Sequence, residues 1–300
     1  MISPPGRTQE TQGKNQTGFF LRVRCVLSGG ALTLRAGALA LLTVSCAPSL
    51  MQLPTGPGAP ASDAVDVLNE VSRMCRVQSM SAEVGVRGKV NGQRLRARLL
   101  VGVARPASAR IEALAPFGAP AFVLSSAGDV ATLLLPRDNR VLEHRHVDEI
   151  LAALTGVPLS AEELRMTLSG CWSSDVVAMR AIAYGAEWRK IIVQPDHGLW
   201  LHREDTNAPW RVVAVMRNIE HSGRRWGVQY GAFQNDIPRS IHIASADSEA
   251  AGTYELDLSL SQVETNVPLG AEVFRVDVPR SAEPITLDEL RHARPGVREN

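Results

Sequence analysis

Side chains that could support covalent or metal chemistry are sparse and scattered in this 300-residue chain. The sequence has none of the spacings typical of a nucleophile elbow, a phosphate-binding loop, a dinucleotide-binding loop or a helical zinc site. His144 and His146 would share one face of a strand, which a metal ion could use, but such short pairs are more often solvated. We therefore expect no enzymatic activity, no metal site and no cofactor.

Cys46 has the most specific chemical context in the sequence. Arg22 and Arg24 precede an apolar stretch that ends with Ala36–Val44, which is typical of an export signal. This stretch is too short to cross a bilayer, which needs ~20 apolar residues. Cys46 directly after Thr43-Val44-Ser45 resembles a bacterial lipobox, in which the cysteine becomes the acylated first residue of the mature protein. Plain cleavage near Ser45, with Cys46 unmodified, is the alternative.

The lipid-anchor interpretation divides the chain into four segments. Residues 1–45 are predicted to be a lipoprotein-type signal peptide, and residues 46–62 an acylated cysteine with a flexible tether rich in Pro, Gly and Ala. Residues 63–280 are predicted to form one folded domain, and residues 281–300 a polar tail. Several acyl chains, such as palmitate, would hold the protein stably on a membrane surface.

The charge balance gives no indication of a nucleic-acid partner. The whole chain has a net charge of +1, and without residues 1–45 it has 27 basic and 30 acidic side chains, a net charge of −3. A nucleic-acid-binding domain usually carries a marked basic excess. We expect no nucleic-acid binding.

Cys75 and Cys171 are the two cysteines inside the predicted domain. An exported protein meets an oxidising compartment, which favours a disulfide between them. Two buried free thiols are the alternative. A bridge would be structural, because it would close a long loop of the chain.

A helix and then a hairpin are predicted after the tether. Apolar residues at helical spacing predict a helix after Ser62, with Ser62 as its N-cap. From about Met80 apolar and charged residues alternate, and Asn91-Gly92 supplies the turn of a β-hairpin. The return strand has a basic face that consists of Arg94, Arg96 and Arg98. This face could contact anionic headgroups, although a solvated face is the ordinary explanation.

The rest of the domain is predicted to be mainly β. Strands with one apolar face follow the hairpin and resume after Cys171, and two short helices interrupt them at 146–154 and 160–168. Ser160 and Glu163 have the spacing of a capping box at the start of the second helix. The layout is α+β, mainly β, and only these few helices are available to cover the apolar face of the sheet. A large curved sheet with a thin helical cover leaves room for a cavity.

An apolar turn between two strands carries Pro116, Phe117 and Gly118. Turn tips are usually polar, so an exposed Phe117 would suit contact with lipid or with a partner protein. Packing of Phe117 back under the sheet is the alternative.

Four stretches of the sequence together resemble the LolB family of outer-membrane lipoprotein receptors, within the wider LolA/LolB-like superfamily. They are Leu114–Gly118, Ala127–Leu135, Asp148–Gly170 and Trp226–Phe233. Their order and spacing agree with the family over most of residues 63–265.

The resemblance implies an open antiparallel half-barrel sheet with helices covering its concave face. Its cavity would bind the acyl chains of other lipoproteins, and Phe117 would assist their insertion into the outer membrane. Candidate cavity residues are Leu99, Val101, Phe122, Leu124, Leu133 and Leu135. A periplasmic LolA-like carrier is the implied partner, and a lipid anchor would hold the domain on the outer membrane, facing the periplasm. The alternative is an envelope lipoprotein of the same fold that binds another lipid or a partner protein.

Overall fold

The computed structural model describes residues 50–128, 130–172, 178–194, 197–219, 224–245 and 253–293. The chain divides into two units, Met1–Ser45 and Cys46–Asn300, and the second is compact in itself. Cys46 and the predicted signal peptide lie outside the described residues, as does the end of the predicted tail. Their roles stay predictions.

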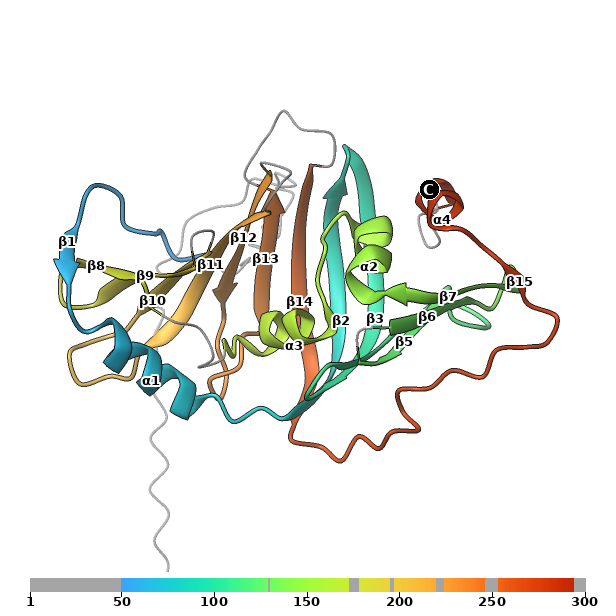
Figure 1. Ribbon diagram of the computed structural model, residues 1–300, viewed down its shortest axis with the longest axis horizontal. Coiled ribbons are helices and arrows are strands. Elements are labelled where there is room, and N and C mark those ends of the chain that lie inside the picture. Colours follow the sequence, from blue (N-terminus) through green and yellow to red (C-terminus); the bar gives the residue numbers. More distant parts are fainter. Residues whose placement is uncertain are drawn as a thin grey trace, which may run out of the picture. The chain divides into compact units, whose positions relative to one another are not determined.

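One open sheet dominates the described residues (Figure 1). Its fifteen strands follow the order β1-β8-β9-β10-β11-β12-β13-β14-β2-β3-β4-β5-β6-β7-β15. The strands are β1 (Ala59–Ala61), β2 (Ser79–Val90), β3 (Gln93–Ala104), β4 (Ser108–Ala113), β5 (Phe122–Ala127), β6 (Val130–Leu135), β7 (Arg140–His146), β8 (Arg180–Tyr184), β9 (Trp188–Gln194), β10 (His197–His202), β11 (Arg211–Ile219), β12 (Arg224–Gly231), β13 (Ser240–Ser245), β14 (Tyr254–Thr265) and β15 (Glu283–Pro284). The prediction of a mainly β chain with a large open antiparallel sheet is confirmed.

Two antiparallel meanders make up this sheet. Strands β2 to β7 form one and strands β8 to β14 the other, and antiparallel pairing of β14 with β2 joins them. The short strand β15 adds to β7 in parallel at one edge. Since β1 and β15 end the strand order and do not pair with each other, the sheet is not closed into a barrel.

Four helices accompany the sheet in the described residues: α1 (Ala64–Met74), α2 (Val147–Thr155), α3 (Ala161–Ser169) and α4 (Leu287–Ala293). The predicted capping box starts α3, because the Ser160 hydroxyl accepts from the Glu163 amide while the Glu163 carboxylate accepts from the Ser160 amide. The prediction that Ser62 is the N-cap of α1 is wrong. Asp63 holds that position and makes no side-chain cap bond, since Arg189 on β9 binds its carboxylate.

The alternation of β2 and β3 decides which face of the sheet is covered. Val84 and Val86 on β2 are buried in the main apolar cluster, whereas Arg87 next to them is exposed. Successive side chains of a strand point to opposite faces, so the helices and the basic residues lie on opposite sides of this hairpin. The Asn91-Gly92 turn is possible because both residues have positive φ, +51° and +76°.

The connection from β7 to β8 has to cross the sheet. These strands lie near opposite edges of the strand order, and α2 and α3 lie on the chain between them. Helix α2 packs against β6 and β7, and α3 against β2, β3 and β4. Beyond α3, the indole of Trp172 donates a 2.9 Å hydrogen bond to the hydroxyl of Tyr230 on β12. The segment 147–172 therefore runs over one face of the sheet, which we call the covered face.

The predicted tether is part of the fold over its described residues. Strand β1 pairs with β8 at the edge of the sheet, and Leu53 packs against an apolar cluster around Trp200. The hydroxyl of Tyr184 donates to the carbonyl of Gly56. The segment from Leu53 to Ala61, which the sequence assigns to the tether, therefore belongs to the fold.

The chain after β14 also belongs to the domain. Arg110 on β4 donates to the carbonyls of Val273 and Arg275, and β15 then passes along the edge strand β7. Ile285 and Leu290 are buried in the main apolar cluster, and α4 packs on α2. The segment 281–300 is thus polar in composition but contributes to the core through its described part.

Truncation of Leu290 tests this packing. We expect Leu290→Ala to lower the free energy of unfolding by about 2–5 kcal/mol, because the side chain is fully buried. The matched change Arg291→Ala in the same helix removes an exposed side chain and should cost less than about 0.5 kcal/mol. Urea unfolding measures both. Equal midpoints for the two variants would contradict the docking of α4.

Candidate functional site

The six predicted cavity residues lie together on the covered face. Register places Val101 on β3 opposite Ile111 on β4, and Ile111 opposite Leu124 on β5. Leu124 lies in turn opposite Leu133 on β6. All six belong to or pack against the main apolar cluster. The structure therefore brings the predicted set into one continuous apolar surface across β3 to β6.

This surface is filled by core packing. Leu124 and Leu133 have no exposed area, and the others are buried except for Leu99, which is half-buried. The helical segment contributes buried apolar residues to the same cluster, namely Ile150, Leu151, Leu164 and Leu168. An apolar ligand on this surface would have to take the place of these helical side chains.

A polar contact ties the helical cover to the second meander. The guanidinium of Arg217 on β11 forms an ion pair with the carboxylate of Glu163 on α3, and both side chains are partly buried. Burial lowers the pKa of Arg217, and the charge of Asp148 on α2 partly offsets this effect. Arg217 therefore contacts α3 through Glu163 and senses the charge of Asp148 on α2. This contact restrains the cover near the middle of the crossover.

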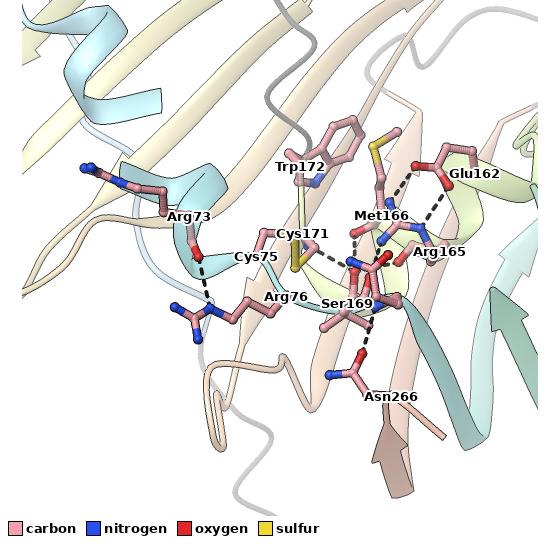
Figure 2. The surroundings of a disulfide bond; sticks show 12 residues. Arg73, Cys75, Arg76, Glu162, Arg165, Met166, Ser169, Cys171, Trp172 and Asn266 are labelled. Atoms are coloured by element: carbon pink, nitrogen blue, oxygen red, sulfur yellow. Dashed lines mark hydrogen bonds and ion pairs between the residues drawn. A yellow bond between two sulfur atoms is a disulfide. The ribbon is translucent and has the colours of Figure 1, made fainter. Parts of the chain in front are cut away.

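A disulfide between Cys75 and Cys171 ties down the end of the cover (Figure 2). Cys75 follows α1 and Cys171 follows α3, and their Cα atoms are 5.2 Å apart. The sequence left open whether these two cysteines form a bridge or stay as free thiols. The structure joins them in a disulfide. The bridge links the helix before the sheet to the crossover segment 96 residues later.

Arg165 is the buried charge of this region. It is 1% exposed, forms a bidentate pair with Glu162, and donates to the carbonyl of Val77 at 2.9 Å. Removing one partner of such a buried pair leaves an uncompensated charge, which is costly. Arg165 thus connects α3 to the chain that enters β2, close to the disulfide (Figure 2).

The predicted insertion loop connects β4 to β5 and exposes its apolar tip. Phe117 is 89% exposed, and Pro116 and Gly118 flank it. Arg137, in the turn after β6, donates to the carbonyl of Phe117 at 2.6 Å and to the carbonyl of Ala119 at 3.1 Å. The side chain does not fold back under the sheet. The loop backbone is held from a neighbouring turn while the ring faces solvent.

The histidine pair of the sequence lies on β7. His144 and His146 are both exposed there, and His144 has a positive φ of +59°. In the described part of the chain, no group of three or more His, Cys, Asp or Glu side chains is arranged to hold a metal ion. The same residues include no helix with the length and apolar character needed to span a bilayer.

Several residues hold the candidate site together through contacts that the sequence pattern did not predict. The capping-box spacing identifies Glu163 as a helix cap, but nothing in the sequence marks Arg217 as its partner. Arg137 and Tyr230 also act through long-range hydrogen bonds, with the β4–β5 loop and with Trp172. Pairings over such separations have no local pattern, so sequence spacing could not have found them.

Comparison of the sequence with protein-family models and with curated proteins finds no match. Among solved structures, the chain is similar to a LolA superfamily protein from Nitrosomonas europaea, with 12% identity, TM-score 0.49, and coverage of 72% of this chain and 99% of that chain. A DUF1329 family protein from Desulfovibrio piger shows 10% identity and TM-score 0.49, with coverage of 72% and 98%. A domain assigned to outer membrane lipoprotein sorting, from Vibrio parahaemolyticus, shows 11% identity and TM-score 0.47, with coverage of 71% and 96%. These likenesses do not establish a family for this chain.

The disulfide generates a stability prediction. We expect Cys75→Ser combined with Cys171→Ser to lower the free energy of unfolding by about 2–4 kcal/mol, because the bridge restricts the unfolded chain over a long loop. Urea unfolding of the oxidised parent and of the double variant measures this difference. The parent reduced with dithiothreitol should unfold close to the double variant. Coincident curves for oxidised parent and double variant would refute a stabilising bridge.

Proposed function

We propose that this protein is a lipid-anchored envelope protein that binds acyl chains of other lipoproteins and helps insert them into the outer membrane. In this proposal Cys46 carries the anchor, the covered face receives the acyl chains, and Phe117 enters the bilayer. The domain faces the periplasm and accepts its cargo from a LolA-like carrier. The work is transfer between apolar environments, so it requires no catalytic residue.

The observation that carries the proposal is the exposure of Phe117. A phenylalanine at 89% exposure leaves a large apolar side chain in water, and its burial in lipid would gain about 1.5–3 kcal/mol. The two hydrogen bonds from Arg137 fix the loop backbone, so the ring is presented without much further ordering. This arrangement suits a residue that enters a bilayer. The likeness of 114–118 to the LolB-family loop agrees with that role.

The covered face supports acyl-chain binding by its composition. Each buried methylene contributes about 0.8 kcal/mol, so a long acyl chain could replace the apolar packing that a cover helix gives up when it moves. The cover is restrained by the disulfide at Cys171 and by the ion pair of Glu163 with Arg217. We expect α2 and the loop after it to move most, because the covalent restraint lies at the other end of the segment.

Substitution of Phe117 tests the insertion step. We expect Phe117→Glu to keep the fold and to reduce lipoprotein insertion by about 10- to 100-fold, because a carboxylate at the tip cannot enter the hydrocarbon layer. Phe117→Leu should retain most activity. A transfer assay with a purified carrier, a fluorescent lipoprotein and outer-membrane vesicles measures the rate.

Val65 on α1 provides a matched control for charge. It is 60% exposed, and Val65→Glu introduces the same carboxylate at a surface helix position. This variant should insert cargo at the parent rate. If Phe117→Glu also inserts at the parent rate, Phe117 has no part in the mechanism.

The identity of the bound ligand decides between the proposal and its alternative. Native mass spectrometry of protein purified from its host should show acylated peptides on the domain. Free lipids, or a stable partner protein, would favour an envelope protein without a sorting role. Depletion in the host should leave other lipoproteins in the inner membrane, and normal sorting would refute the receptor role.

A further inference from the structure

The face of the β2–β3 hairpin opposite the covered face has a dense group of cations. Its exposed basic side chains are Arg87, Lys89, Arg94, Arg96 and Arg98. We call these five residues the basic face. They alternate with the apolar residues of both strands that pack toward the helices, so none of them faces the predicted acyl-chain site.

Register brings like charges into direct opposition on this face. Arg87 on β2 lies opposite Arg96 on β3, and Lys89 lies opposite Arg94. Like charges at directly opposite positions of an antiparallel pair are destabilising. Two such pairs in succession are unfavourable for the hairpin in isolation, and an external anion would compensate for them.

Glu83, Glu255 and Asp257 border the basic face, but only Glu83 forms an ion pair with it among the described residues. Arg98 pairs with Glu83 at 2.6 Å. Asp257 on β14 lies opposite Arg87 in the register, and its carboxylate is 2.8 Å from the imidazole of His242. Glu255 lies beside Lys89 in the register of β14 and β2, and the structure shows no ion pair between them. Arg87, Lys89, Arg94 and Arg96 make no ion pair within the described ranges.

The basic face and Phe117 lie toward the same end of the sheet. Leu99 on β3 pairs with Ala113, the last residue of β4. The loop after Ala113 therefore leaves the sheet toward the end at which β3 begins, where the Asn91-Gly92 turn lies. Arg137, which holds the loop, lies in the β6–β7 turn at this end as well. The exposed apolar tip and the basic face are therefore both presented toward one end of the first meander.

We propose that the basic face docks the domain on the surface of an anionic phospholipid bilayer. Guanidinium and ammonium groups donate charge-assisted hydrogen bonds to lipid phosphates, and an anionic surface relieves the repulsion between Arg87 and Arg96. A two-stranded ribbon spreads these charges over an area, as a membrane surface requires. This docking needs no cargo and lies on the opposite face of the sheet from the acyl-chain site, so it goes beyond the proposed function.

Vesicle binding by the domain without its anchor tests the proposal. The protein is the compact unit 46–300 with Cys46→Ser, purified in oxidised form. The vesicles contain equal parts of phosphatidylglycerol and phosphatidylethanolamine, or of phosphatidylcholine and phosphatidylethanolamine. We expect binding to the anionic vesicles only, and a marked loss on raising salt from about 0.05 M to about 0.5 M.

A quadruple variant tests whether the basic face is responsible for vesicle binding. Arg87→Gln, Lys89→Gln, Arg94→Gln and Arg96→Gln together should weaken the partition onto anionic vesicles by about 100- to 1,000-fold. The variant removes mutually repelling charges, so its urea midpoint should equal or exceed that of the parent, which excludes misfolding as the cause.

A matched quadruple variant controls for net charge. It carries Arg73→Gln, Arg76→Gln, Arg145→Gln and Arg280→Gln, all at exposed positions outside the basic face. This protein should bind anionic vesicles within about threefold of the parent. Equal losses in the two quadruple variants, or unchanged binding by the first, would overturn the proposal. Neither result bears on cargo binding, which the mass spectrometry above measures separately.

Discussion

Pairing of β14 with β2 is the interaction on which the rest of the structure depends. It joins two meanders that would otherwise be separate sheets, and it leaves β7 and β8 far apart in the strand order. Because β7 and β8 are consecutive along the chain, their connection has to pass over one face of the sheet. The helical cover is thus a consequence of topology, and the apolar residues of that face are buried beneath it.

The restraints on the cover are unevenly distributed. The disulfide at Cys171 and the buried Arg165 lie together at one end, where α1, α3 and the start of β2 meet. The ion pair of Glu163 with Arg217 adds one polar contact further along. Helix α2 is held mainly by apolar packing on the sheet and on α4. Apolar packing has no fixed direction, so this end of the cover can exchange partners at lower cost than the bridged end.

The two proposed roles, acyl-chain binding and membrane docking, belong to opposite faces of the sheet. In the proposed function the covered face would supply apolar area for acyl chains. On its other face the β2–β3 hairpin carries Arg87, Lys89, Arg94 and Arg96, which make no ion pair within the described residues. Phe117 lies beyond the end of β4, toward the end of the sheet that carries the basic face. A domain oriented by its cations would bring that ring to the bilayer, which connects a surface interaction to an insertion step.

Alternating residues determined much of the local structure. The pattern after Met80, the Asn91-Gly92 turn and the Ser160–Glu163 spacing predicted a hairpin and a capped helix, since each depends on neighbours within a few residues. The same alternation of residues predicted the basic side chains of β3, Arg94, Arg96 and Arg98. The tether and the tail gave no local sign of their packing, because Leu53 meets the Trp200 cluster and Leu290 meets the core only across long separations.

Tertiary structure alone decided what those elements do together. Strand pairing set Arg87 against Arg96 and brought Arg217 to Glu163, and no local spacing encodes either contact. The sequence identified Phe117 as an apolar turn residue and left its exposure open, because exposure depends on whether a neighbouring segment covers the ring. The structure answers through Arg137, which binds the loop backbone and leaves the ring in solvent.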